Sequence, residues 1–382
     1  MIAGPFAGRL LADLGADVIK VELPGRGDPL RDWKHLHGGT SLWWRVQSRN
    51  KRCVTADLRK PEGRALARRL IAQSDVLIEN FRPGTLERWG LDPEELRRGR
   101  PELVVVRVSG FGQTGPYRGR AGLGAVAEAM GGIRYITGDP NTPPSRTGIS
   151  LADEIAALFA VIGALAGLLR RGSTGRGDTV DVALYEAVFA LMEAAVTEYV
   201  YSGEVRERSG GAYPGVAPSN TYSTADGAFV VIGGNSDELF KRLMACVGRP
   251  ELAEVERYRT NPGRAADAAL IDGAIAAWTG GLTLRECLAA LEAAGVPAGP
   301  IYSVADIARD PQYRARGMLL ERSLADGTPL TIPGLVPKFA EAPGSVEWLG
   351  PETIGADNAA VYGELLGLEP DELGRLAREG VI

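Results

Sequence analysis

Residues 103–108 read Leu-Val-Val-Val-Arg-Val, a short run dominated by valine. β-Branched residues favour strands, and an apolar run without polar alternation indicates a strand that is covered on both faces. Strand-like runs precede it at residues 17–22, 51–58 and 75–78, and residues 61–73 show a helical pattern with proline in its first turn. Strands that alternate with helices predict a doubly wound α/β domain.

The start of the chain departs from this plan. A domain of this kind normally opens with a strand, but the first helical pattern, at residues 6–14, begins almost at Met1. We therefore expect the first β-strand of the domain to be missing from this chain. The same stretch lacks the basic and apolar regions of a secretory leader, so we expect a cytoplasmic protein.

The composition disfavours several classes of protein. The formal net charge is -5, so no overall positive field favours nucleic acid or an anionic membrane. The three cysteines fit no paired spacing, which argues against a disulfide framework and for a reducing compartment. His35 and His37 are the only histidines, so an imidazole zinc site or a Ser-His-Asp triad would have to use that pair. Residues 155–169 are the most apolar stretch, and they are too few to cross a bilayer, which predicts a buried helix.

Two domains and a return segment are predicted along the chain. Residues 1–201 form the large domain, which ends with one long helix at residues 185–201. Glycine, serine and proline are frequent in residues 202–225, which we interpret as a linker. A smaller α/β domain follows at residues 226–322. Residues 323–382 form a return segment whose C-terminal helices pack on the large domain.

Residues 110–115 read Gly-Phe-Gly-Gln-Thr-Gly and match the glycine fingerprint of dinucleotide-binding domains. That fingerprint requires a helix that begins within the glycines, so that its N-terminus faces the pyrophosphate. Pro116, Tyr117 and Gly119 predict a loop instead. We therefore interpret the segment as a glycine-rich connection at the carboxyl end of a strand.

A second connection, at residues 79–88, also follows a strand. Open α/β sheets bind ligands at the carboxyl ends of their strands. Arg82 and Arg88 could hold phosphate oxygens, Phe81 could stack on a ring, and Arg59 after an earlier strand would add positive charge. Taken alone, arginines of this kind are more often solvated surface.

Asp153 stands directly before an apolar helical pattern, in the sequence Ser-Leu-Ala-Asp at residues 150–153. As a functional hypothesis, it is a nucleophile, since a helix N-terminus favours the ionised acid and attack requires a carboxylate. The alternative is structural, because the same four residues form a capping box in which the acid only satisfies backbone donors. The spacing alone favours the structural alternative.

Gly233 and Gly234, with Asn235, follow a predicted strand at residues 229–232. The pattern alone favours a turn that ends the strand. The functional alternative is a loop without side chains, in which substrate lies close to backbone N–H groups or is covered during the reaction.

Short motifs also occur in a fixed order along the whole chain. They are AGPF at residues 3–6, LGADVIKVE at 14–22, GDP at 27–29, NKR at 50–52, ENFRPG at 79–84, SGFGQTGP at 109–116, TGRG at 174–177, ADG at 225–227, GRP at 248–250 and GVPAGP at 295–300. By these motifs the chain resembles the class III CoA-transferases, the CaiB/BaiF family, which include formyl-CoA transferase.

The resemblance implies an α/β subunit with a Rossmann-type large domain and a smaller α/β domain. It implies a homodimer whose chains are threaded through each other like linked rings. The implied activity is transfer of CoA from an acyl-CoA thioester to a small carboxylic acid. Coenzyme A enters as a substrate, and no tightly bound cofactor, metal, nucleic acid or membrane is expected. The identities of the donor and the acceptor acid are left open.

The resemblance also implies roles for individual residues. Asp153 takes the position of a nucleophile that forms an aspartyl-acyl anhydride and then an aspartyl-CoA thioester. Gly233 and Gly234 take the position of a mobile loop that closes over these intermediates. The residues implied to contact CoA are Ala3, Leu23, Ala56, Asp57, Leu58, Arg59, Asn80, Phe81, Arg82, Arg88, Ala121, Gly122 and Leu123.

Two of these residues depart from the family pattern. Leu23 stands where the formyl-CoA enzyme has an arginine, which predicts altered contacts with adenosine. Leu123 stands where the related α-methylacyl-CoA racemases carry a histidine base, which disfavours racemisation. A racemase-like enzyme and a CoA-binding protein without catalysis are the alternative functions.

Overall fold

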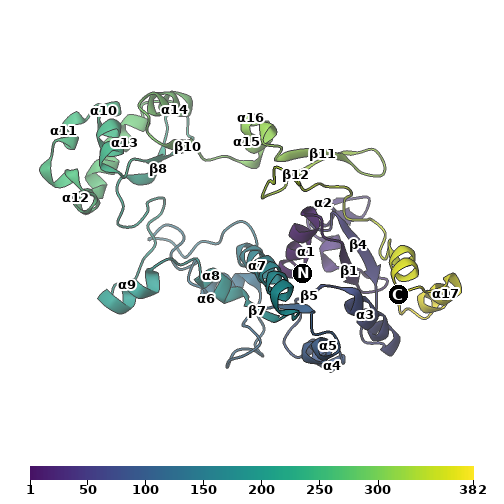
Figure 1. Cartoon of the computed structure of the whole chain (residues 1–382). Coiled ribbons are helices and arrows are strands. Elements are labelled where there is room, and N and C mark those ends of the chain that lie inside the picture. Colours follow the sequence, from purple (N-terminus) through teal and green to yellow (C-terminus); the bar gives the residue numbers. More distant parts are fainter. The chain divides into compact units, whose positions relative to one another are not determined.

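The computed structural model describes residues 1–382, which form two compact units (Figure 1). Unit 1 consists of Met1–Ile133, Thr147–Glu193 and Arg314–Ile382. Unit 2 consists of Arg134–Arg146 and Ala194–Tyr313. The chain therefore passes between the units four times.

The strands of unit 1 that the sequence predicts are all present and parallel. β1 (Val18–Glu22) pairs with β4 (Lys51–Thr55) in a two-stranded sheet. β6 (Val104–Ser109) lies between β5 (Val76–Glu79) and β7 (Thr179–Ala183) in a three-stranded sheet. All six residues of β6 are buried, which confirms a strand covered on both faces. The predicted α/β class is confirmed, and the sheets are small and open.

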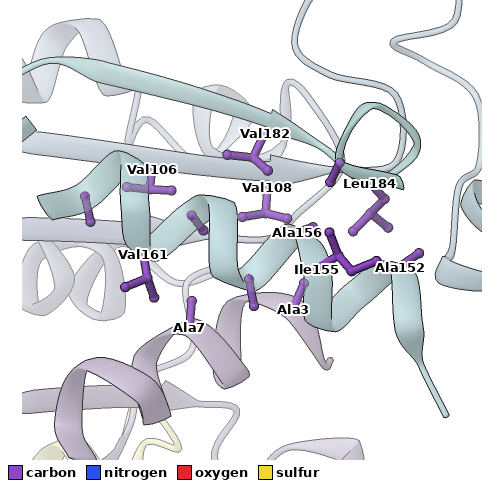
Figure 2. Close-up of a cluster of buried hydrophobic side chains, with 14 of the residues drawn as sticks. Ala3, Ala7, Val106, Val108, Ala152, Ile155, Ala156, Val161, Val182 and Leu184 are labelled. Atoms are coloured by element: carbon purple, nitrogen blue, oxygen red, sulfur yellow. The ribbon is translucent and has the colours of Figure 1, made fainter. Parts of the chain in front are cut away.

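Small side chains let two helices pack beside the central strand. Figure 2 shows α7 (Leu151–Thr174) between β6 and α1 (Ala3–Asp13), with Ala3 and Ala7 of α1 on one side of α7 and Val106 and Val108 of β6 on the other. Because alanine has a short side chain, the backbones of the two helices can approach closely. This packing fixes the first turn of α7, which carries Asp153, against the core of unit 1.

Helix α7 is longer than the predicted apolar stretch at residues 155–169, since it contains 24 residues. By length and composition it is the one helix of the structure that could cross a membrane, so its length alone does not exclude a span. Eight of its residues are buried within unit 1, as the sequence predicts for a core helix. Its opposite face exposes Leu158, Ile162, Leu165 and Leu169.

The other elements of unit 1 are shorter than α7, and helix α3 (Pro61–Gln73) is the longest of them with 13 residues. Residues 354–382 pack on α3 and β4, with Val361, Tyr362 and Leu376 against Val54 and Leu66. The remaining elements are η1 (Pro29–Asp32), β2 (Leu36–His37), β3 (Thr40–Ser41), α2 (Leu42–Gln47), α4 (Thr85–Arg88), α5 (Pro93–Gly99), α6 (Gly124–Met130), α8 (Leu184–Phe189), β11 (Leu319–Ser323), β12 (Pro329–Pro333), the π-helix η3 (Ala359–Leu365) and α17 (Pro370–Arg378).

Unit 2 is built on an antiparallel sheet of three strands. β9 (Phe229–Gly233) lies between β8 (Ser219–Ser223) and β10 (Ala298–Pro300). Its helices are α9 (Ala195–Ser202), α10 (Asp237–Cys246), α11 (Pro250–Ala253), η2 (Glu256–Arg259), α12 (Asn261–Ala266), α13 (Ala268–Thr279), α14 (Leu284–Ala293) and α15 (Val304–Arg309), and α16 (Pro311–Ala315) leads back to unit 1. Buried residues of α10, α13 and α14 pack on β9.

The prediction of one long helix at residues 185–201 is wrong. The structure has α8 and α9 with a break between them, where Glu193 adopts a left-handed φ of 50°. The break contains neither glycine nor proline, so the apolar pattern continues through it without a local signal. The predicted linker also contains β8, whose short polar sequence carries little strand signal.

Candidate active site

Asp153 lies in the first turn of α7, where its side chain is partly exposed. Ser150 precedes the helix and makes no side-chain cap hydrogen bond, so the predicted capping box is not formed. Asp153 shares the inner face of α7 with Ala156 and Ala157, the residues three and four positions further on, which are buried in the core. The prediction that Asp153 belongs to a capping box is therefore wrong.

The carboxylate of Asp153 lies against Gly124, the first residue of α6. A Cβ atom placed on Gly124 would lie 2.1 Å from Oδ2 of Asp153. The segment before Gly124 is also held close, because a Cβ on Gly110 would lie 2.8 Å from Cα of Gly122. The structure thus brings Ala121, Gly122 and Leu123 together with Asp153, at the carboxyl end of β6. Residues 110–123 form a loop, which confirms that the GxGxxG match opens no helix.

Glu154 follows Asp153 and has a perturbed carboxyl group. Burial raises the pKa of Glu154, and the negative charge of Asp153 raises it further, while Arg9 opposes the rise. Arg9 is itself affected, because burial and the like charge of Arg49 lower its pKa to about 10. Arg9 therefore stays cationic at neutral pH and favours negative charge at this end of α7.

Asn80 joins three elements of unit 1. Its Oδ1 accepts a hydrogen bond from the backbone N–H of Gly4 at 3.3 Å, and its Nδ2 donates to the carbonyl of Val108 at 2.8 Å. These bonds bring the start of α1 to the carboxyl ends of β5 and β6. Ala3, a predicted contact of CoA, is fully buried at 0 % exposure, so its side chain belongs to the core.

A buried acid that the sequence analysis missed orders the next part of the site. Glu79 accepts a hydrogen bond from the backbone N–H of Phe81 through Oε2, and its Oε1 pairs with Nε of Arg107, both at 2.8 Å. Arg107 also pairs with Glu87 at 2.8 Å. The register of the sheet places Glu79 opposite Arg107, but this register is not visible in the sequence.

The three predicted ring and phosphate contacts of this segment lie on the surface. Phe81 is 40 % exposed and packs edge-on against Trp89, with ring centroids 5.1 Å apart. Arg82 and Arg88 are exposed, and Arg88 donates to the hydroxyl of Thr85 at 2.9 Å. Exposed cations and a half-exposed ring at the end of a strand can bind an anionic ligand with an aromatic base.

The other predicted contacts follow β1 and β4. Leu23 comes directly after Glu22, whose carbonyl accepts a hydrogen bond from the N–H of Ala56 at 2.9 Å. Two hydrogen bonds of 2.8 Å join the carboxylate of Asp57 to the guanidinium of Arg59, and they lower the pKa of Asp57. Arg59 would therefore approach a phosphate with part of its charge already balanced. Leu58 lies between these two residues in the same loop.

The glycine loop lies in unit 2 and is tied down in this conformation. The N–H of Gly233 donates to Pro297, and the N–H of Gly234 donates to Pro218, both at 2.9 Å. Arg264 donates to the carbonyl of Asn235 at 2.8 Å. The two glycine N–H groups are thus occupied, which matches a turn that ends β9 and does not match free donors for an oxyanion.

No group of three or more histidine, cysteine, aspartate or glutamate side chains lies close enough together to hold a metal ion. The candidate site in unit 1 consists of the Asp153 carboxylate and loops at the carboxyl ends of parallel strands.

This combination of fold, motifs and carboxylate is that of the CoA-transferases of family III, whose family model matches residues 1–358, and the chain belongs to this family. It is an enzyme of the CoA-transferase class, which confirms the prediction from the motifs.

Three proteins illustrate the relationship. The succinyl-CoA–D-citramalate CoA-transferase of Chloroflexus aurantiacus is 49% identical over 100% of this chain and 95% of its own length. The beta subunit of the succinyl-CoA–L-malate CoA-transferase from the same organism is 42% identical, with 100% and 95% covered. A crystal structure of a CaiB/BaiF family protein from Brucella suis has a TM-score of 0.83 and 38% identity, covering 95% of this chain and 96% of that one.

Proposed function

We propose that this enzyme transfers CoA from succinyl-CoA to a short 2-hydroxy dicarboxylic acid, and that Asp153 carries the acyl group and the CoA in turn. The observation that carries the proposal is the position of the Asp153 carboxylate at the start of a core helix, against Gly124 at the end of the loop that follows β6. The substrate class is supported by the two relatives, whose names join succinyl-CoA to citramalate or malate.

The reaction divides into four nucleophilic steps. The Asp153 carboxylate attacks the thioester carbonyl, so that CoA leaves as a thiolate and an aspartyl-succinyl anhydride forms. The thiolate then attacks the aspartyl carbonyl, which releases succinate and forms an aspartyl-CoA thioester. The acceptor carboxylate displaces CoA from this thioester, and the thiolate finally attacks the acceptor's carbonyl carbon and regenerates Asp153. No net proton transfer is required.

The ionised form of Asp153 is favoured by the N-terminus of α7, a helix of 24 residues. Binding of CoA is assigned to Leu23, to the segment 56–59, to Asn80, Phe81, Arg82 and Arg88, and to residues 121–123 before Gly124. Remote contacts of this kind position the thioester, so that binding energy is used to orient the reacting atoms. The Gly233 and Gly234 N–H groups would stabilise an oxyanion only after their bonds to unit 2 carbonyls break.

We further propose that the large unit is of the Rossmann type and that two chains interlock as a homodimer in the cytoplasm. The dimer is supported by apolar side chains that are exposed in the single chain. Leu169 of α7 is 79% exposed, and Val200 and Tyr201 of α9 are 78% and 94% exposed. Apolar surface on each of these helices, such as the face of α7 that exposes Leu158, Ile162, Leu165 and Leu169, is typical of interaction sites in soluble proteins. A monomer in light scattering at assay concentration would contradict this part of the proposal.

The test of the chemistry combines exchange and trapping. Wild-type enzyme is incubated with succinyl-CoA and either D-citramalate or L-malate, and the CoA esters are separated and quantified. Hydroxylamine added during turnover is expected to leave a hydroxamate on Asp153, detected by peptide mass spectrometry. Asp153→Ala is expected to fold and to lose both exchange and the adduct, whereas the adjacent variant Glu154→Gln still forms the adduct at Asp153.

An active wild-type enzyme that never shows the modified Asp153, or an Asp153→Ala variant that retains exchange, would contradict the proposed chemistry. Deuterium uptake from solvent into a 2-methylacyl-CoA without any acceptor acid would instead indicate racemisation. Leu123 provides no base for that reaction.

A further inference from the structure

We infer that Gly124 is a positioning residue for the nucleophile, because the absence of its side chain leaves the space that the Asp153 carboxylate occupies. The inference rests on the proposed role of Asp153. It concerns a residue that was not among the predicted contacts of CoA or of the intermediates.

The distances between Gly124 and Asp153 carry the argument. A Cβ atom on Gly124 would lie 2.1 Å from Oδ2 and 3.1 Å from Cγ of Asp153, whereas real Cβ contacts essentially never fall below 3.0 Å. The carboxylate oxygen would therefore have to retreat by at least about 0.9 Å, the difference between 3.0 and 2.1 Å. Gly124 is not among the glycines with positive φ, so its backbone does not itself require glycine.

The main chains on both sides of this contact are held in place. On the side of α7, Ala152 and Ile155 are buried in the same core cluster as Ala3 of α1. On the side of α6, Ala127 is buried, and Gly122 lies against Gly110 at the end of β6. Neither backbone can withdraw without disturbing close-packed residues. The torsions of the Asp153 side chain are the softest coordinates, so a methyl group at position 124 would turn the carboxylate away.

Helix propensity and chain entropy alone predict that Gly124→Ala does no harm, so any loss that is observed can be attributed to the contact with Asp153. Alanine is a better helix former than glycine and restricts the unfolded chain more. Without the contact, Gly124→Ala at the start of α6 would be neutral or stabilising. A loss of stability or of rate therefore reports on the contact with Asp153.

The expected kinetic effect follows from the sensitivity of covalent catalysis to geometry. A displacement of about 1 Å in a reacting group can lower a rate about 10²-fold. We expect Gly124→Ala to lower kcat for CoA exchange by about this factor, while KM for the acyl-CoA stays close to that of the wild type, because Gly124 is not itself a proposed CoA contact and the atoms nearest to its added methyl group all belong to Asp153. Gly119→Ala is the matched control, since Gly119 lies in the preceding loop with nothing within 4 Å of its added Cβ.

The closing experiment is a double-mutant cycle with two readouts, on full-length wild type, Gly124→Ala, Asp153→Ala, the double variant and Gly119→Ala. In thermal unfolding, Gly124→Ala is expected to change Tm less favourably in the wild-type background than in the Asp153→Ala background, because the truncated residue 153 no longer meets the new methyl group. In exchange assays, only Gly119→Ala is expected to match the wild type.

Each outcome decides the inference. Equal changes of Tm in both backgrounds, or an unchanged kcat of Gly124→Ala, would overturn it. If Gly124→Ala is insoluble and the double variant folds, the contact is supported, whereas insolubility of both would assign Gly124 to the fold alone. Full exchange by Asp153→Ala would refute the proposed function, and the thermal cycle would still test the contact separately.

Discussion

Lys51 provides a pH-dependent test of how unit 1 is held together. It is the first residue of β4, and its side chain is buried. Its ammonium donates to the carbonyl of Pro5 at 2.6 Å and to the carbonyl of Gln47, the last residue of α2, at 2.8 Å. Lys51 therefore joins α1 to the C-terminus of α2, where a positive charge is favourable. Burial nevertheless lowers the pKa of Lys51 to about 7, with the like charge of Lys20 adding to the effect.

The sign of the pH dependence follows from this pKa. An unfolded lysine titrates near about 10.4, so between about pH 7 and pH 10 the unfolded chain binds more protons than the folded one. The free energy of unfolding is then expected to rise with pH, by at most about 1.4 kcal/mol per pH unit and by about 2 kcal/mol between pH 7 and pH 9. Below about pH 7 both states are protonated, and this contribution becomes flat.

The measurement is urea unfolding of wild type and Lys51→Met at a series of pH values from 6 to 9. The methionine keeps an apolar side chain of similar length and removes the ammonium, so the free energy of unfolding of the wild type minus that of Lys51→Met should rise steadily with pH. Lys34→Met is the control, because Lys34 is exposed and should leave the wild-type slope unchanged. Parallel profiles for wild type and Lys51→Met would refute the reasoning.

Three further predictions concern single contacts. Gly63→Ala would place a Cβ 2.2 Å from the carbonyl oxygen of Asp57 and would displace the proposed CoA-binding segment 56–59. KM for the acyl-CoA is therefore expected to rise more than kcat falls. An unchanged KM would count against a role of residues 56–59 in CoA binding. Glu79→Gln weakens the charged hydrogen bond to Arg107 and is expected to lower the free energy of unfolding by about 2 kcal/mol in urea, which an unchanged midpoint would contradict. Arg264→Met removes hydrogen bonds to three carbonyls of unit 2 and an ion pair with Asp237. The free energy of unfolding measured by calorimetry is expected to fall by about 3 to 5 kcal/mol. A fall below about 1 kcal/mol would show that these bonds contribute little.

Local patterns predicted the elements whose signals are local. The helical pattern at residues 61–73 coincides with α3, and the apolar run at residues 103–108 differs from β6 by one residue at each end. In both cases the apolar spacing matches the buried face of the element, so the pattern and the packing agree.

Features that depend on neighbours distant in the sequence were not predictable. Asp153 and Gly124 are far apart in the chain, and no pattern in the residues between them predicts their contact. The pairing of Glu79 with Arg107 requires the strand register, which no local signal fixes. The capping box at Asp153 failed for the converse reason, since a suitable spacing does not oblige Ser150 to form the bond.

The inner face of α7 has a consequence for how this enzyme can vary. Ala156 and Ala160 are fully buried, and added Cβ atoms on Gly163 and Gly167 would lie 2.5 Å from Val180 and 2.9 Å from Val104. A bulkier residue on this face would push helix α7 away from the strands. The first turn of the helix, which carries Asp153, would then be displaced as well. Substitutions are therefore expected to be tolerated on the exposed face of α7 and to be rare on its buried face, both in natural variants and in engineered ones.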